Sequence, residues 1–152
     1  MNDSIVVVDD EVLMREVLVR WLRAAGYRTT DTHDATTALE MVAADEPAVV
    51  LVDVEMPGRD GLWLVERLRE RFPSVAIVLA TARDNVPPSV SMQDGVVDYL
   101  VKPFELDRVV AAVKRAVEWH EAAVSRGSTG AATADPLDAW VRGGRPPSNG
   151  PR

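Results

Sequence analysis

Short apolar runs alternate in this sequence with longer stretches of helical periodicity, and this alternation limits the fold more than any other feature. The runs that we expect to form strands are residues 5–8, 28–32, 48–54, 75–80 and 97–101. The expected helices are residues 12–25, 35–44, 61–71 and 105–124, with a less regular one beginning near residue 85. Strict alternation of strands and helices is typical of repeated βαβ units, whose strands run parallel in one sheet.

The apolar content of each run separates central strands from edge strands. Residues 48–52 are all apolar, as expected of a strand that helices cover on both faces. Residues 28–32 are mostly polar, so we place this strand at a sheet edge. Because crossover connections are right-handed, the predicted fold class is α/β, with a doubly wound, five-stranded parallel sheet and five flanking helices.

Several residues mark where the helices begin and end. Asp34 and Asp60 stand directly before two helical stretches, where a carboxylate can accept hydrogen bonds from the free backbone amides of the first turn. Gly26 follows the first helix and is expected to end it. Pro87 and Pro88 interrupt the segment after the fourth strand, so we expect a short or mobile fourth helix there.

Composition excludes several classes of protein. The net charge of −7 and the isoelectric point of about 4.8 argue against direct nucleic-acid binding, which needs a basic face. The absence of cysteine excludes disulfides, thiolate metal sites and thiol catalysis. No apolar stretch is long enough to span a bilayer, and the first residues do not resemble a signal peptide. We therefore expect a cytoplasmic protein without membrane contact.

The composition changes near residue 124. Residues 125–152 contain five of the nine glycines and four of the ten prolines, which is typical of a disordered segment. We therefore divide the chain into a domain of residues 1–124 and a disordered tail of residues 125–152. Within the tail, Asp135 and Pro136 precede Leu137, Trp140 and Val141 at helical spacing, so a short docking helix is an alternative.

Polar residues stand at the ends of four predicted strands. Asp9 and Asp10 follow the first strand, and Asp53 lies at the end of the third. Thr81 follows the fourth strand, and Lys102 follows the fifth. Because ligand sites in open parallel sheets form beyond the carboxyl ends of the strands, we expect these side chains to lie close together.

Each of these residues alone has a purely structural explanation. An acidic pair can complement a helix dipole, and a lysine is often a solvated surface residue. Three carboxylates gathered together are harder to explain, because two unit charges about 4 Å apart cost about 4 kcal/mol at an effective dielectric constant of about 20. A divalent cation would relieve this repulsion, and a set of oxygen ligands favours magnesium over zinc. The strand ends therefore predict a Mg2+ site.

Four motifs at these strand ends occur together, in one order and at characteristic spacing. They are Val6-Val7-Val8-Asp9-Asp10-Glu11, Asp53-Val54-Glu55-Met56-Pro57-Gly58, Thr81-Ala82 and Asp98-Tyr99-Leu100-Val101-Lys102-Pro103-Phe104. In these motifs the chain resembles the response-regulator receiver family of two-component signalling, over roughly residues 3–122. The resemblance implies a flavodoxin-like three-layer sandwich with strand order 2-1-3-4-5.

The resemblance also implies a reaction at the acidic residues. Asp53 would take a phosphoryl group from the phosphohistidine of a sensor histidine kinase or phosphotransfer protein, or from a small phosphodonor. Asp10, Asp53 and the backbone carbonyl of Glu55 would bind Mg2+ directly, with Asp9 acting largely through water. Positioning and charge neutralisation by metal and lysine are the main contributions to such a transfer.

The remaining motif residues would bind the phosphoryl group and respond to it. The Thr81 hydroxyl, the Ala82 backbone amide and the Lys102 ammonium would contact its oxygens, and the bond before Pro103 would be cis. Movement of Thr81 toward the phosphoryl group would leave space into which Tyr99 rotates. Such a switch changes the populations of two existing conformations.

The resemblance leaves the output of this signal open. An unknown partner would bind the face formed by the fourth helix, the fifth strand and the fifth helix, and phosphorylation-dependent homodimers are a further expectation. The sequence contains no recognisable output domain, so the chain is either a stand-alone receiver or a fragment of a longer regulator. We expect no enzymatic activity beyond self-catalysed phosphotransfer and dephosphorylation.

Two other classes of function are alternatives. A Mg2+-dependent phosphatase with an aspartyl nucleophile has a similar layout, and Glu55 stands at the position of its usual second acid. Such phosphatases also carry a substrate-gripping cap, for which this chain has no room. A receiver-like binding scaffold that is never phosphorylated is the second alternative, although this sequence has lost none of the acidic or lysine positions.

Overall fold

The computed structural model describes residues 3–56, 58, 60–82 and 93–133, and the predicted alternation of strands and helices is present in it. The strands are β1 (Ser4–Val8), β2 (Arg28–Thr32), β3 (Val49–Asp53), β4 (Ala76–Thr81) and β5 (Val96–Val101). The helices in the described part are α1 (Val12–Ala24), α2 (Ala35–Ala44), α3 (Gly61–Arg71) and α5 (Leu106–Thr133). The predicted fourth helix falls mostly on residues 83–92, which lie outside the described residues.

The five strands form one parallel sheet in the order β2-β1-β3-β4-β5. The predicted strand order is therefore confirmed, and the polar strand β2 lies at an edge as expected. β1 and β3 pair in register, with Val8 opposite Val52. This register places the residues that follow β1 beside the last residue of β3, at the same edge of the sheet.

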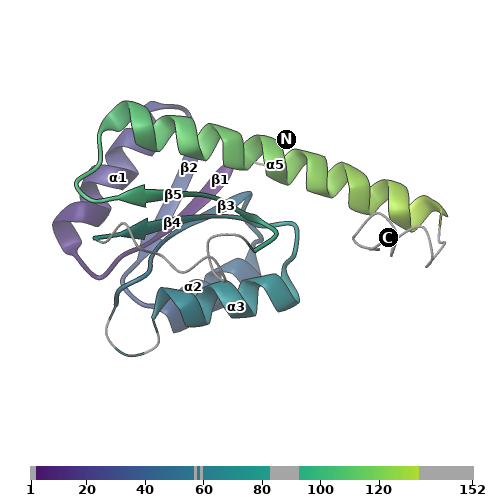
Figure 1. The fold of residues 1–152 in the computed structure, drawn as a ribbon, viewed down its shortest axis with the longest axis horizontal. Coiled ribbons are helices and arrows are strands. Elements are labelled where there is room, and N and C mark those ends of the chain that lie inside the picture. Colours follow the sequence, from purple (N-terminus) through teal and green to yellow (C-terminus); the bar gives the residue numbers. More distant parts are fainter. Residues whose placement is uncertain (1–2, 57, 59, 83–92, 134–152) are drawn as a thin grey trace. The chain divides into compact units, whose positions relative to one another are not determined.

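Helices cover both faces of the sheet (Figure 1), because alternate side chains of each central strand point to opposite faces. Ile5, Val7 and Leu51 pack with α1 and α5. Val6, Val8 and the other face of β3 pack with α2 and α3. All five residues of β3 are buried, which agrees with the uninterrupted apolar run that identified this strand.

The predicted helix caps are confirmed. The Asp34 carboxylate accepts a hydrogen bond from the Thr37 amide at 2.7 Å, and the Asp60 carboxylate accepts one from the Trp63 amide at 3.1 Å. Gly26 has a φ of 101° after α1. Glycine adopts this left-handed conformation without the steric cost that a side chain would impose.

The start of α3 lies very close to the end of β3. A Cβ atom on Gly61 would overlap with the backbone carbonyl of Asp53. Glycine therefore lets α3 begin directly against the residue at the centre of the predicted site, and Asp60 caps the helix one residue earlier.

The last helix is longer than the sequence indicated. We expected it to end near Val124, but α5 continues to Thr133. Gly127 and Gly130 suggested an earlier end because glycine costs about 1 kcal/mol in a helix interior, whereas Ala131 and Ala132 are strong helix formers. The chain divides into two compact units, residues 1–121 and 122–152, so the end of α5 belongs to the second unit.

The remaining tail predictions concern residues 134–152, which lie outside the described residues. They include the alternative of a docking helix around Trp140. In the described part of the chain, no helix is both long enough and apolar enough to cross a membrane.

Candidate functional site

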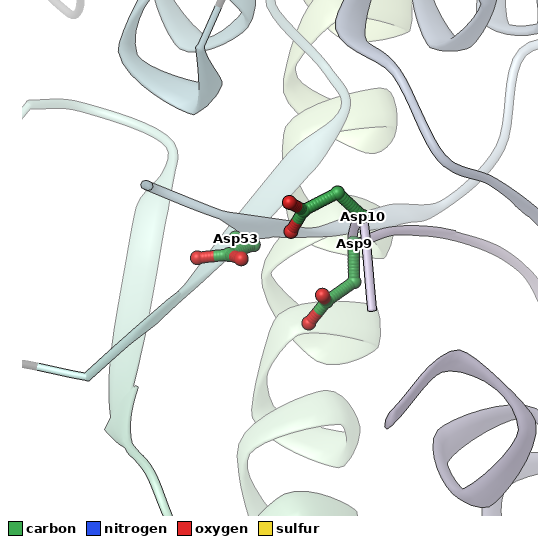
Figure 2. A group of neighbouring side chains, drawn as sticks. All are labelled: Asp9, Asp10 and Asp53. Carbon is green, nitrogen blue, oxygen red and sulfur yellow. The ribbon is translucent and has the colours of Figure 1, made fainter. Parts of the chain in front are cut away.

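Three aspartates meet at the carboxyl edge of the sheet. Asp9 and Asp10 directly follow β1, and Asp53 is the last residue of the neighbouring strand β3. Figure 2 shows their side chains gathered in one place, and one carboxylate oxygen from each lies within 4.8 Å of those of the other two. The predicted convergence of the strand ends is therefore present in the structure.

Backbone amides orient the two buried carboxylates. Asp9 is 1% exposed and Asp53 is 3% exposed, whereas Asp10 is exposed. The Glu11 amide donates to Asp9 Oδ1 at 2.9 Å, and the Glu55 amide donates to Asp53 Oδ1 at 3.0 Å. Each carboxylate thus accepts a hydrogen bond from the amide two residues later, which leaves its second oxygen for other partners.

Lys102 brings a positive charge from the end of β5 to these second oxygens. Its Nζ lies 3.1 Å from Asp9 Oδ2, 3.4 Å from Asp53 Oδ2 and 3.0 Å from Glu11 Oε1. Burial alone would lower the pKa of the Lys102 ammonium, but the hydrogen bond to Glu11 and the charges of Asp9 and Asp53 raise it overall. Lys102 is therefore charged at neutral pH.

The environment of Asp53 opposes its ionisation. Burial raises the pKa of the Asp53 carboxyl to about 6, and the neighbouring Asp9 charge acts in the same direction. The Glu55 amide and the Lys102 ammonium lower this pKa but only partly offset the desolvation. The positive charge of Lys102 therefore does not fully offset the free-energy cost of ionising Asp53 in this buried, acidic cluster.

The donor set fits a hard divalent cation. Its ligands would be carboxylate oxygens, which bind magnesium better than softer metals. Asp9 Oδ2 is buried and has no hydrogen-bond partner of acceptable geometry among the described residues, although the Lys102 charge lies nearby. A buried carboxylate oxygen with spare acceptor capacity is what a metal or a metal-bound water would satisfy.

Thr81 and Ala82 extend the site to the end of β4. The Thr81 side chain is buried, and the Thr81 carbonyl accepts a hydrogen bond from the Lys102 amide at 2.7 Å. The Ala82 amide donates to Glu55 Oε1 at 3.3 Å. The ends of β3, β4 and β5 are therefore joined by direct hydrogen bonds around Asp53.

Tyr99 and Pro103 lie on β5 and just after it. Tyr99 is 39% exposed, and its carbonyl accepts a hydrogen bond from Arg108 of α5 at 3.1 Å. Arg108 and Arg115 both pair with Asp98, so β5 and α5 are tied together beside Tyr99. The Lys102–Pro103 bond is cis.

The sequence did not assign a site role to the Glu11 side chain, which was interpreted only as part of an acidic helix start. Glu11 does occupy the N-cap position of α1, but its side chain makes no capping hydrogen bond. It bonds to Lys102 instead, 91 residues away in the sequence. No local pattern indicates such a contact; only the predicted convergence of the first and fifth strand ends could have suggested it.

Comparison with known proteins identifies what the chain is similar to. A family model described as the response regulator receiver domain matches residues 5–114. The DNA-binding transcriptional regulator NtrC of Escherichia coli is 40% identical over 116 residues, which are 76% of this chain and 25% of NtrC. The response regulator MprA of Mycobacterium tuberculosis is 41% identical over 115 residues, 75% of this chain and 50% of MprA. The chain thus spans a quarter to a half of the length of these curated relatives.

Solved structures give the same result for the fold. The receiver domain of NtrX from Brucella abortus superimposes with a TM-score of 0.69 at 33% identity, over 75% of this chain and 98% of that domain. A putative response regulator from Chloroflexus aurantiacus superimposes with a TM-score of 0.71 at 30% identity, over 78% of this chain and 99% of that one.

Proposed function

The chain belongs to the response regulator receiver domain family, and we therefore propose that Asp53 accepts a phosphoryl group in a Mg2+-dependent reaction. The observation that carries the proposal is the convergence of Asp53 with Asp9, Asp10 and the Lys102 ammonium at one sheet edge. The donor would be the phosphohistidine of a sensor histidine kinase or phosphotransfer protein, or a small phosphodonor.

The residues of the site have distinct tasks in this transfer. An Asp53 oxygen forms a bond to phosphorus while the bond to the donor's leaving atom breaks, which gives an aspartyl phosphate. The Glu55 amide holds one Asp53 oxygen and Lys102 lies near the other, so the carboxylate is already oriented before the donor arrives. Such orientation lowers the entropic part of the barrier.

Asp9, Asp10, Asp53 and the Glu55 backbone carbonyl would hold the metal. When bound, Mg2+ would supply positive charge that offsets both the acidic cluster and the charge of the incoming phosphoryl group. The buried and incompletely satisfied Asp9 Oδ2 supports this assignment.

The signal would leave the site through β4 and β5. The Thr81 hydroxyl, the Ala82 amide and Lys102 would bind the phosphoryl oxygens, and the movement of Thr81 would allow Tyr99 to rotate inward. The exposed position of Tyr99 and the link from its carbonyl to α5 are compatible with this switch. Differential contacts in the two states are what shift such an equilibrium.

The remaining assignments are proposals on the same basis. The output face would consist of a fourth helix, β5 and α5, and would bind an unknown partner or a second copy of the chain. Residues 1–124 would be the receiver and residues 125–152 a linker or tail. Cytoplasmic location, the absence of direct nucleic-acid binding and the absence of activity beyond self-catalysed phosphotransfer and dephosphorylation also stay predictions.

Intact mass measurement tests the proposal. The wild-type chain, incubated with acetyl phosphate and Mg2+, should gain the mass of one phosphoryl group, and the gain should disappear when the metal is chelated or in alkali. Asp53→Asn should gain none. Equal labelling of Asp53→Asn would contradict the assignment, and an unlabelled wild type would favour the scaffold alternative. Turnover of phosphate esters would favour the phosphatase.

A further inference from the structure

Two glutamates lie on the groups that are proposed to bind the phosphoryl oxygens. Glu11 Oε1 is 3.0 Å from the Nζ of Lys102. Glu55 Oε1 accepts a hydrogen bond from the Ala82 amide at 3.3 Å. Neither carboxylate has a task in the phosphotransfer described above, because Glu55 would contribute only its backbone carbonyl to the metal.

Both contacts connect residues that are distant in the sequence. Glu11 and Lys102 are 91 residues apart, and Glu55 and Ala82 are 27 residues apart. Glu11 has the N-cap position of α1, yet its side chain does not cap the helix. The tertiary structure therefore directs each carboxylate to a donor on another strand end.

A carboxylate and a phosphoryl group present the same chemistry to these donors. Both offer negatively charged oxygens that accept charge-assisted hydrogen bonds from an ammonium or a backbone amide. A phosphoryl group on Asp53 would need the same Lys102 and Ala82 protons. It would also carry about two negative charges near Glu11 and Glu55, in place of the single charge of the Asp53 carboxylate.

We propose that Glu11 and Glu55 are intramolecular competitors of the phosphoryl group, whose carboxylates hold Lys102 and the Ala82 amide until phosphorylation displaces them. This inference rests on the proposed function. The competition makes the phosphorylated state harder to reach and shorter-lived than the metal and lysine alone would allow. Glu11 and Glu55 are thus positioning residues that set the occupancy of the switch.

The expected effect follows from the exposure of the two glutamates. Both are exposed. Replacing either with glutamine keeps an acceptor oxygen but removes the charge, so each substitution weakens one charge-assisted hydrogen bond and removes one screened charge repulsion. Together these correspond to roughly a threefold to tenfold change in affinity. The two contacts involve different donors, so their effects should multiply. Added salt should reduce the effect, because screening weakens the repulsion between exposed charges.

Beryllofluoride, a non-covalent phosphoryl analogue, provides the direct test at saturating Mg2+. Its dissociation constant is measured by calorimetry on the full chain for wild type, Glu11→Gln, Glu55→Gln and the double variant. Glu16→Gln is the matched control, because Glu16 lies in α1 beside Arg20 and Arg23 rather than at the site. Each single variant should bind roughly threefold to tenfold more tightly, the double variant should combine the gains, and the control should match wild type.

The outcomes separate this inference from the proposed function. If wild type binds beryllofluoride and the glutamine variants bind equally or more weakly, the competition is refuted while the phosphoacceptor role stands. If no variant binds it, including wild type, both fail. If the glutamates had a purely structural role, their substitution would lower the melting temperature without tightening the binding of beryllofluoride. Thermal melts of all variants therefore distinguish a structural role from competition.

Discussion

Asp53→Asn should stabilise the metal-free protein, and the gain should depend on pH. Asp53 is 3% exposed and lies beside Asp9, and burial raises the pKa of its carboxyl from 3.8 to about 6. A raised pKa in the folded state means that ionisation opposes folding. Asparagine keeps an oxygen that can accept the Glu55 amide hydrogen bond but removes the buried charge.

The magnitude follows from the difference between the two pKa values. A shift of about two units corresponds to about 3 kcal/mol, because one unit is about 1.4 kcal/mol. The penalty is absent well below the unfolded pKa of 3.8, where the carboxyl is protonated in both states. It grows as the pH rises and is complete above about 6. At about pH 5 roughly half of the full penalty should be present.

Urea unfolding in the presence of a chelator measures this effect. Asp53→Asn should exceed wild type by about 3 kcal/mol near pH 8, and the difference should fall toward zero as the pH drops to about 4. Asp45→Asn, at the exposed C-terminal end of α2, serves as the control and should change stability by less than about 0.5 kcal/mol. A variant less stable than wild type near pH 8, or a difference independent of pH, would show that the buried Asp53 charge does not oppose folding.

Further predictions concern the metal ligands, the N-terminal cap of α2 and the glycine at the start of α3. Saturating Mg2+ should raise the melting temperature of wild type, and Asp10→Asn should lose most of this gain because it removes one carboxylate of the cluster; an undiminished gain in a thermal melt would exclude Asp10 as a ligand. Asp34→Ala should cost about 1 kcal/mol in urea unfolding through the lost cap of α2, with phosphorylation unchanged. Gly61→Ala should lower the free energy of unfolding by more than about 2 kcal/mol and slow phosphorylation by acetyl phosphate, because its Cβ would overlap with the Asp53 carbonyl. A normal rate and stability would show that the backbone at the end of β3 moves aside at little cost.

Much of the fold could be predicted because local signals and the packing agree. The apolar run that became β3 indicated a central strand, and all five of its residues are buried. Asp34 and Asp60 indicated helix starts, and both make the expected capping hydrogen bonds. The length of α5 could not be predicted in the same way, because four consecutive residues, Gly-Ser-Thr-Gly at 127–130, have poor helix propensity and yet lie inside the helix.

The site could be predicted only as far as topology determines it. The rule that parallel strands end at one edge was enough to bring Asp53, Asp9 and Lys102 together. The direction of each side chain was not predictable, since Glu11 had two plausible partners, the amides of its own helix and the ammonium of Lys102. The distances between these groups in the folded protein decide between them. In the structure the Glu11 carboxylate contacts the Lys102 ammonium and does not cap α1.

The proposed phosphoacceptor is Asp53 rather than a neighbouring acid, and chemical trapping of the acyl phosphate distinguishes the two. Reduction of the acyl phosphate with borohydride converts the modified aspartate to homoserine, which peptide mass mapping then locates. After incubation with acetyl phosphate and Mg2+, we predict homoserine at position 53 alone. Homoserine at position 9 or 10, or at no position in a labelled chain, would contradict the assignment of Asp53 as the phosphoacceptor.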